Sequence, residues 1–389
     1  MAKIVKFPQG FLWGSATSAY QVEGGIENCD WSKVYPAGIA CDHYNRYEKD
    51  FDLAKSLNQN AHRFSIEWSR IEPREGEFDQ TEIEHYRKVL LALRKRGIKS
   101  IVTLWHWTNP VWLAEKGGWT NQEAVNYFAR YVKKIAEELG GLIDFWVTLN
   151  EPMVHIAAGY IDGRFPPRKK NLPQALRVLK NLIKAHKSAY GIIHAKYPLA
   201  RVSIAQAVSY FEPASHWCPL EILFADIGDY LSNRYFLLKV KNQLDYLGLN
   251  YYFHNRVVWY PPFVKNLNKK ITDIGWEIYP EGIYHILKNL SRFKKPIYIL
   301  ENGLADAKDE KRKKFMKDHL HWIGKAVEEG IDCRGYFHWS LMDNFEWEKG
   351  FSSRFGLVEM NYKTLERKPR PSAFYYAKIC KENQLEINS

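Results

Sequence analysis

Cysteine is scarce in this chain, since only five of its 389 residues are cysteine and no two of them form a CxxC pair. They are Cys29, Cys41, Cys218, Cys333 and Cys380. An odd number at irregular spacing argues against both a disulfide framework and a zinc ribbon. The chain is long and 46% hydrophobic, so it can bury a large core without such crosslinks. We therefore expect a reducing, cytoplasmic environment.

Long apolar runs are absent as well. No segment approaches the roughly 18 uninterrupted apolar residues of a membrane span, and residues 1–8 lack the apolar stretch and cleavage site of a secretory signal. Neither GxxxxGKS/T nor a GxGxxG after a predicted strand occurs, and His319 and His321 point to different faces of a predicted helix. Cys29, Cys41 and His43 remain as a weak candidate set for a metal. We expect a protein that is neither transmembrane nor secreted, with no cofactor and no metal.

Charge is not concentrated in any one segment. The chain has 56 Lys and Arg against 44 Asp and Glu, a net charge of +12, but the densest basic run, residues 308–317, alternates with acidic residues. This spread argues against a nucleic-acid partner. Aromatic residues make up 15% of the chain and include 14 Trp, a content that suits an apolar core, a membrane interface or a sugar-binding cleft.

Eight short runs rich in β-branched or aromatic residues alternate with longer stretches of helical periodicity. The runs are residues 11–16, 61–65, 99–104, 145–149, 202–205, 246–250, 297–300 and 334–339. The helical stretches include residues 44–57, 81–96, 122–139, 172–195 and 309–329. No linker-like segment interrupts the series. The pattern predicts an α/β fold, a single (β/α)8 TIM barrel spanning residues 1–389, with its active site at the C-terminal ends of the strands.

Two glutamates follow apolar predicted strands directly, Glu151 after the fourth and Glu301 after the seventh. Parallel barrel strands end at one mouth, so these carboxylates are expected to face each other there. A pair of carboxyls in different environments supplies the proton donor and the negative group that glycoside hydrolysis needs. The alternative for each glutamate alone is a helix cap or an ion pair with an arginine.

Arg63 lies on the second predicted strand, where an isolated charge would be costly. We expect it to pair with Glu301 and to lower the pKa of that carboxyl, while Glu67 is the alternative partner. Pro152 predicts a sharp exit from the fourth strand. The preceding Asn150 can then hydrogen-bond a sugar 2-hydroxyl.

Other strand ends carry hydrogen-bonding and aromatic side chains suited to a pyranose ring. Glu346 can accept bonds from two neighbouring hydroxyls, and Trp339 offers an apolar face to the C–H side of the sugar. His106, between two tryptophans, is either part of this ring or a buried structural histidine. The proposed ring consists of Gln21, His106, Asn150, Trp339, Glu346 and Trp347.

Five ordered motifs resemble those of glycoside hydrolase family 1, the β-glucosidase and β-galactosidase family. They are residues 7–24, residues 63–71, the Thr148-Leu149-Asn150-Glu151-Pro152 motif, the Leu300-Glu301-Asn302-Gly303 motif and residues 339–347. The resemblance implies a retaining β-glycosidase with Glu151 as acid/base and Glu301 as nucleophile. The substrate would be a small-molecule β-glycoside or oligosaccharide.

The same resemblance implies that Tyr252 hydrogen-bonds the nucleophile and that Phe355 closes one wall of the sugar subsite. Glu346 stands where the phospho-β-glycosidase branch lacks an acid, and Glu151 where thioglucosidases carry Gln. Leu300 replaces a usual Thr, and the segments 153–201 and 207–244 are short for the family. These short segments bear on the aglycone side, while the sugar site is intact.

A sugar-binding relative without activity and a metal-dependent barrel hydrolase are the rival classes. Hydrolysis of aryl β-glycosides would exclude a sugar-binding relative without activity. Activity that is insensitive to chelators would exclude a metal-dependent hydrolase. Two further segments, residues 210–224 and 259–270, combine aromatic residues, prolines and lysines. They are expected either to pack on the barrel near the substrate entrance or to make a peripheral membrane contact.

Overall fold

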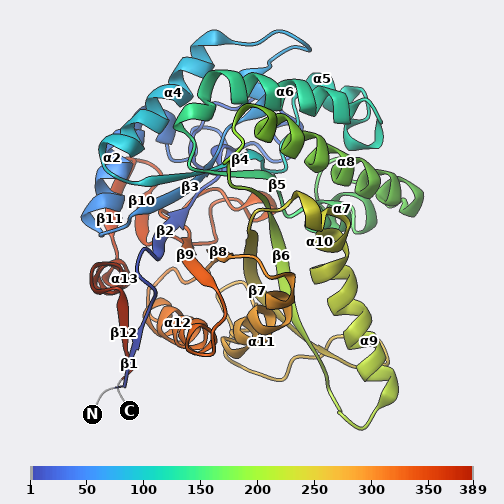
Figure 1. Cartoon of the computed structure of the whole chain (residues 1–389), viewed down its shortest axis with the longest axis vertical. Helices are drawn as coiled ribbons and strands as arrows, with labels where there is room; N and C mark the ends of the chain where they lie inside the picture. Colours follow the sequence, from blue (N-terminus) through green and yellow to red (C-terminus); the bar gives the residue numbers. More distant parts are fainter. Residues whose placement is uncertain (1–2, 388–389) are drawn as a thin grey trace.

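The computed structural model describes residues 3–387, within which eight parallel strands close into a barrel surrounded by helices (Figure 1). The strands pair in chain order, and β2 closes the ring by pairing with β9. They are β2 (Leu12–Ala16), β3 (Ala61–Ser65), β4 (Lys99–Trp105), β5 (Phe145–Asn150), β6 (Val202–Pro213), β7 (Leu247–Val257), β8 (Ile297–Asn302) and β9 (Cys333–Trp339). The predicted TIM barrel and its eight strands are confirmed.

The main helices lie in the segments between the barrel strands and after the last of these strands. They are α2 (His43–Ser56), α4 (Gln80–Lys95), α6 (Ala124–Leu139), α8 (Leu172–Lys196), α11 (Glu281–Leu290), α12 (Arg312–Glu328) and α13 (Pro371–Glu382). The remaining helices are α1 (Ala19–Val22), α3 (Trp68–Ile71), α5 (Val111–Glu115), α7 (Pro152–Ile156), α9 (Pro219–Asp229) and α10 (Tyr235–Val240). The five predicted helical stretches correspond to α2, α4, α6, α8 and α12 within a few residues.

Local sequence explains these elements. Asp79 caps α4 by accepting hydrogen bonds from the amides of Thr81 and Glu82 at 2.8 and 3.2 Å. Along α6, Phe128, Val132, Ile135 and Leu139 recur at helical spacing and are all buried. Such faces bind the helices to the outer surface of the barrel.

The barrel interior is filled by side chains that point inward from the strands. They form one cluster of Ala61, Ile101, Phe145, Val147, Ala205, Tyr246, Tyr298, Leu300 and Phe337. The cluster makes the barrel a packed core, so the space for chemistry lies at its mouth.

Two departures from the sequence prediction concern strand length. β6 and β7 run on past the barrel as a pair, in register from Ser209 opposite Phe253 to Pro213 opposite Val257. The outer residues of β6 are half-buried, those of β7 range from buried to exposed, and both sets are mixed in polarity, so no apolar run marks them. Four short strands were also missed: β1 (Lys3–Lys6) pairs with β12 (Gln384–Ile387), and β10 (Val358–Asn361) pairs with β11 (Glu366–Pro369).

Candidate active site

A cavity of about 330 Å³ opens at the C-terminal ends of the barrel strands. Nine of the predicted site residues line it: His106, Asn150, Glu151, Tyr252, Glu301, Trp339, Glu346, Trp347 and Phe355. Gln21 and Arg63 are fully buried, and each contacts a lining residue. The structure therefore brings all predicted site residues together at one mouth.

Glu151 leaves β5 in an unusual backbone conformation. Its φ of 45° and ψ of 57° place it in the left-handed region, and Pro152 begins α7 directly after it. Trp107 and Trp347, which also line the cavity, have positive φ angles of 74° and 51°. Each such residue costs about 1–3 kcal/mol, a cost that the surrounding fold must offset. Glu151 caps no helix through its side chain, contrary to the alternative drawn from sequence.

Glu301 lies near the end of β8 and faces two donors. The guanidinium of Arg63 pairs with its Oε1, and the hydroxyl of Tyr252 donates to its Oε2 at 2.9 Å. Arg63 also donates to Asn150 Oδ1 at 2.6 Å. The alternative partner Glu67 is engaged elsewhere, because it accepts bonds from Ser69 and Thr108.

Glu151 has a neutral partner. The amide of Asn250, on β7 at the level of the barrel mouth, donates to Glu151 Oε1 at 2.8 Å and to Asn150 Oδ1 at 3.2 Å. The sequence analysis placed Asn250 at a strand end without giving it a role. Its strand-end position was the available signal, while its orientation toward Glu151 follows from the packing of β5 beside β6 and β7.

Burial and mutual repulsion perturb both carboxyls. Burial, followed by the negative charge of Glu301, raises the pKa of Glu151 to about 8. Burial also raises the pKa of Glu301 above its usual value, although Arg63 and Tyr252 both act to lower it. The expected lowering by Arg63 is therefore confirmed, but desolvation outweighs it, so the net shift of the Glu301 pKa is upward. Arg63 and the Tyr252 phenol both favour the ionised form of Glu301, whereas the hydrogen-bond partner of Glu151 is a neutral amide.

His106 and Asn150 form one wall of the cavity. Asn150 Nδ2 donates to His106 Nε2 at 3.0 Å, so this nitrogen is the unprotonated one. Burial, with the nearby charge of Arg63, holds the pKa of His106 well below its usual range. The ring therefore stays neutral, and its Nδ1 carries the proton.

Glu346 and two tryptophans line the cavity beside His106. The His106 ring lies nearly parallel to Trp339 and Trp347, with centroids 6.2 and 5.9 Å away. Gln21 donates to the Phe345 carbonyl at 2.9 Å and to Glu346 Oε2 at 3.4 Å. Burial raises the pKa of Glu346 to about 8. This lining thus offers aromatic faces beside a carboxyl, an arrangement suited to a sugar ring.

Further apolar residues line the cavity, and the sequence analysis missed them. They are Met153, Val154, Ala157, Ala158, Ala207, Val208, Phe253 and Trp276. Ala207 and Val208 lie on β6 just before its extension and beyond the predicted run of residues 202–205, where the sequence carried no recognisable signal. Arg164, paired with Glu348 at 3.1 Å, and Lys349 add charge to the lining. Among residues 3–387 no cluster of three or more His, Cys, Asp or Glu side chains is suited to a metal ion.

Comparison with known proteins identifies a family. The family model described as glycosyl hydrolase family 1 matches residues 4–240 and 235–385. β-Glucosidase A of Thermotoga maritima is 34% identical over 444 aligned positions, which cover 98% of this chain and 99% of that protein. A β-galactosidase of Pyrococcus woesei is 31% identical, with 94% of each protein covered.

Solved structures agree with these relatives. A β-glycosidase from Pyrococcus horikoshii superposes with a TM-score of 0.93 at 39% sequence identity, covering 100% of this chain and 97% of that one. The β-glucosidase from Thermotoga maritima in complex with glucoimidazole superposes with a TM-score of 0.91 at 33% identity, covering 97% and 99%.

Proposed function

The chain belongs to glycosyl hydrolase family 1, and from this premise we propose that Glu301 is its nucleophile and Glu151 its acid/base. The protein is a retaining β-glycosidase that acts through a covalent glycosyl-enzyme. One observation supports the assignment above all: Glu301 faces a cation and a phenol, while Glu151 faces an amide and has a pKa raised to about 8. The nucleophile must be ionised and the acid protonated, and these surroundings favour those states.

The reaction runs in two displacements. Glu301 attacks the anomeric carbon while Glu151 gives its proton to the glycosidic oxygen, so the C–O bond breaks and the aglycone leaves as an alcohol. Glu151, now ionised, then takes a proton from water, whose oxygen attacks the anomeric carbon and releases Glu301. Two inversions return a β-configured sugar. This geometry requires carboxyls about 5–5.5 Å apart.

The remaining predicted residues act on the sugar. Asn150 holds the 2-hydroxyl, and Glu346 accepts bonds from two further hydroxyls. Trp339, Trp347 and Phe355 pack around the sugar ring. His106 donates a hydrogen bond from Nδ1 to the sugar. Gln21 acts through Glu346, since its amide is occupied by that carboxylate and by neighbouring backbone. We propose terminal β-D-glucosides and β-D-galactosides as substrates, as the names of the relatives suggest.

Two variants test the catalytic roles. Glu301→Gln should abolish turnover of aryl β-glucosides and β-galactosides. Glu151→Ala should spare glycosylation by substrates with good leaving groups, and added azide should restore turnover and yield a β-glycosyl azide. NMR should detect the β-anomer as the first sugar released by the wild type. An α-anomer as first product, or wild-type inactivity on the whole aryl β-glycoside panel, would refute the proposal.

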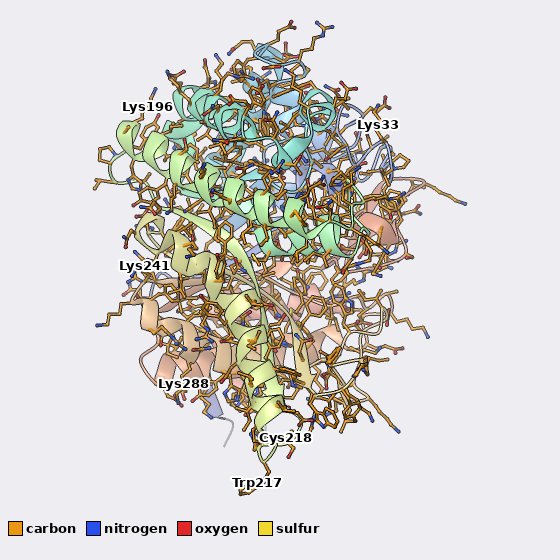
Figure 2. All side chains as sticks on the ribbon, turned by 90° about the vertical axis from the view of Figure 1, so that its right-hand side faces the viewer. Lys33, Lys196, Trp217, Cys218, Lys241 and Lys288 are labelled. Carbon is orange, nitrogen blue, oxygen red and sulfur yellow. The ribbon has the colours of Figure 1, made fainter. Side chains whose placement is uncertain are left out.

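We further propose that the outer end of the β6–β7 extension contacts an anionic lipid surface. Among residues 3–387 no helix is long and apolar enough to cross a membrane, so such contact would be peripheral. Trp217 is 93% exposed, Trp259 53% and Phe263 50%. In Figure 2 Trp217 forms the lowest point of the molecule, beyond the start of α9. The rings of Phe224 on α9 and Phe263 lie 6.5 Å apart, which joins the two segments into one surface.

Charge complementarity favours lipid as the occupant of this surface. Lys265 is exposed two residues after Phe263, Lys269 and Lys270 are exposed farther along the same segment, and the chain carries a net charge of +12. Exposed aromatic rings beside lysines suit the headgroup level, where each basic residue contributes about 1 kcal/mol. An enzyme held there can take substrates with long apolar aglycones from the bilayer.

Co-sedimentation with phosphatidylserine-containing vesicles tests this proposal. We expect binding at low salt that weakens in Trp217→Ser and in the double variant Trp259→Ser/Phe263→Ser. Leu199→Ser is the matched control, because Leu199 is 96% exposed and precedes the opposite end of β6. Absence of binding, equal binding by all variants, or self-association through this surface instead would each overturn it.

A further inference from the structure

We propose that Asp343 is a positioning residue for the sugar pocket, joining the loop that carries Glu346 to the segment that carries Phe355. This inference rests on the proposed role of Glu346 in binding sugar hydroxyls. Asp343 lies in the loop after β9 and is fully buried. It does not line the cavity described above, and the proposed mechanism does not use it.

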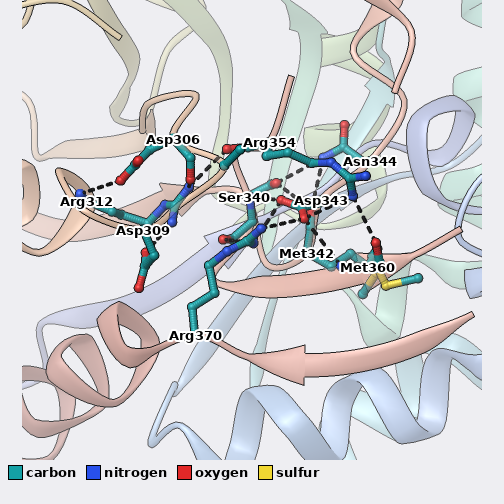
Figure 3. Close-up of polar contacts among 12 residues, drawn as sticks. Asp306, Asp309, Arg312, Ser340, Met342, Asp343, Asn344, Arg354, Met360 and Arg370 are labelled. Atoms are coloured by element: carbon teal, nitrogen blue, oxygen red, sulfur yellow. Dashed lines mark hydrogen bonds and ion pairs between the residues drawn. The ribbon is translucent and has the colours of Figure 1, made fainter. Parts of the chain in front are cut away.

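The Asp343 carboxylate gathers donors from several segments (Figure 3). Arg370, just before α13, donates to Oδ1 at 3.0 Å and to Oδ2 at 2.8 Å. The amide of Gly356 donates to Oδ1 at 2.9 Å. Arg354 and the Met360 amide each reach Oδ2 at 3.3 Å. A carboxylate can hold all of these donors at once, whereas a neutral amide of the same shape cannot.

These contacts hold two walls of the pocket against each other. Gly356 is adjacent to Phe355, and Asp343 precedes Glu346 by three residues. The two backbones touch, since a Cβ on Gly356 would lie 2.1 Å from the Asp343 nitrogen. Only glycine permits this approach, so the carboxylate and the glycine together set the distance between Phe355 and the Glu346 loop.

The loop itself is connected from Asp343 to Glu346. Asn344 donates to Ser340 Oγ at 2.9 Å and accepts from Gln21 Nε2 at 3.0 Å. Gln21 in turn contacts Glu346. A shift of Asp343 therefore moves the group that orients the Glu346 carboxylate.

The same assembly reaches the loop behind the nucleophile. The Arg354 carbonyl accepts from Arg312 Nη2 at 3.0 Å and from the Asp306 amide at 2.9 Å. Asp306 lies five residues after Glu301 in the loop that follows β8. Arg312, Asp306 and Arg354 appear together beside the Asp343 cluster in Figure 3. Asp343 thus stands where the loops after β8 and β9 meet the segment of Phe355.

Monodeoxy aryl β-glucosides measure the positioning of Glu346 separately from the amount of folded enzyme. The hydroxyls held by Glu346 are identified as those whose removal lowers kcat/KM in the wild type but not in Glu346→Gln. In the wild type each should cost about 10–100-fold, as hydrogen bonds to a charged group do. For each of these substrates, the ratio of kcat/KM on the parent glucoside to kcat/KM on the deoxy substrate should fall to a few-fold in Asp343→Asn. In the same variant, kcat/KM for the parent glucoside should drop about 10–100-fold.

Two controls separate positioning from simple destabilisation. The 2-deoxy substrate probes Asn150, so its ratio should stay unchanged in Asp343→Asn. Asp50→Asn is the matched variant, because Asp50 is equally buried and pairs with Arg367 at 2.7 Å outside the cavity lining. It should lose stability yet keep all deoxy ratios.

Each result decides the question. Equal loss on parent and deoxy substrates in Asp343→Asn, with unchanged ratios, would show a structural role alone and overturn the inference. If Asp343→Asn does not fold, Arg354→Met replaces it, because Arg354 is a half-buried partner of the same carboxylate. Its ratios should fall by several-fold, and unchanged ratios would overturn the inference. A wild type inactive on all aryl glycosides would refute the proposed function instead.

Discussion

Replacing Arg63 with methionine removes the cation that contacts Glu301. The arginine is 1% exposed and also donates to Asn150 Oδ1 at 2.6 Å and Thr103 Oγ1 at 3.1 Å. Methionine keeps an unbranched apolar stem but no charge. Burial of Glu301 would then act with less opposition, since the Tyr252 hydrogen bond remains as the main stabiliser of its carboxylate.

The size of the effect follows from the contact. Loss of an opposite charge at this range raises a carboxyl pKa by about 1–3 units, or about 1.4–4 kcal/mol. The acidic limb of kcat/KM should move upward by that amount, because Glu301 must be ionised to attack. Arg63 also lowers the pKa of Glu151, but more weakly than it lowers that of Glu301. The basic limb should therefore rise less, and the bell should narrow.

The free energy of unfolding of Arg63→Met should also depend on pH through Glu301. Burial already holds the folded-state pKa of Glu301 above its usual 4.5. A carboxyl with a raised folded pKa destabilises the fold as pH rises through the unfolded value, and the full cost is present above the folded pKa. Relative to the wild type, Arg63→Met should thus lose little stability from this carboxyl near pH 4 and about 1.4–4 kcal/mol once pH exceeds its new folded pKa.

The assay combines pH profiles of kcat/KM with thermal unfolding at several pH values. Arg63→Lys is the control, because it keeps a positive charge and should move the acidic limb less. An unmoved acidic limb in Arg63→Met, or a stability deficit independent of pH, would refute the electrostatic assignment of Arg63 to Glu301.

Three further predictions follow from the site. In inactive Glu301→Gln, NMR titration of a labelled Glu151 carboxyl should give a pKa below the wild-type value of about 8, because repulsion is removed, yet above 4.5, because burial remains; an unchanged value would mean the two carboxyls do not interact. Asn250→Ala removes a hydrogen bond that lowers the pKa of Glu151, so the basic limb of kcat/KM should move upward, and a downward shift would contradict this. Treatment with EDTA followed by gel filtration should leave kcat/KM unchanged, whereas loss that Mg²⁺ or Zn²⁺ restores would favour a metal-dependent hydrolase.

The barrel could be predicted because the sequence patterns that indicate it are local. Alternating apolar runs and helical faces recur along the chain, and parallel strands must end at one mouth. The same rule placed Glu151, Glu301 and Trp339 together, since each follows or ends a predicted strand. The ordered motifs then indicated the family. Each of these predictions depended only on residues that are neighbours in the sequence.

Interactions between distant segments had no such local signal. The Asn250 bond to Glu151 and the extension of β6 and β7 depend on how neighbouring strands pair. The left-handed backbone of Glu151 depends on packing that offsets its strain. No pattern within one segment reports any of these features.

The pKa of Glu301 depends both on features visible in the sequence and on features that only the tertiary structure sets. Sequence alone identified Arg63 as a cation on a barrel strand and Glu301 as a carboxyl at another strand end, so their pairing and the direction of its effect could be reasoned out. The net pKa of Glu301 could not, because it is the balance between that attraction and desolvation. Desolvation is set by every segment that closes over the mouth, including the loop held by Asp343, and therefore only the tertiary structure decided it.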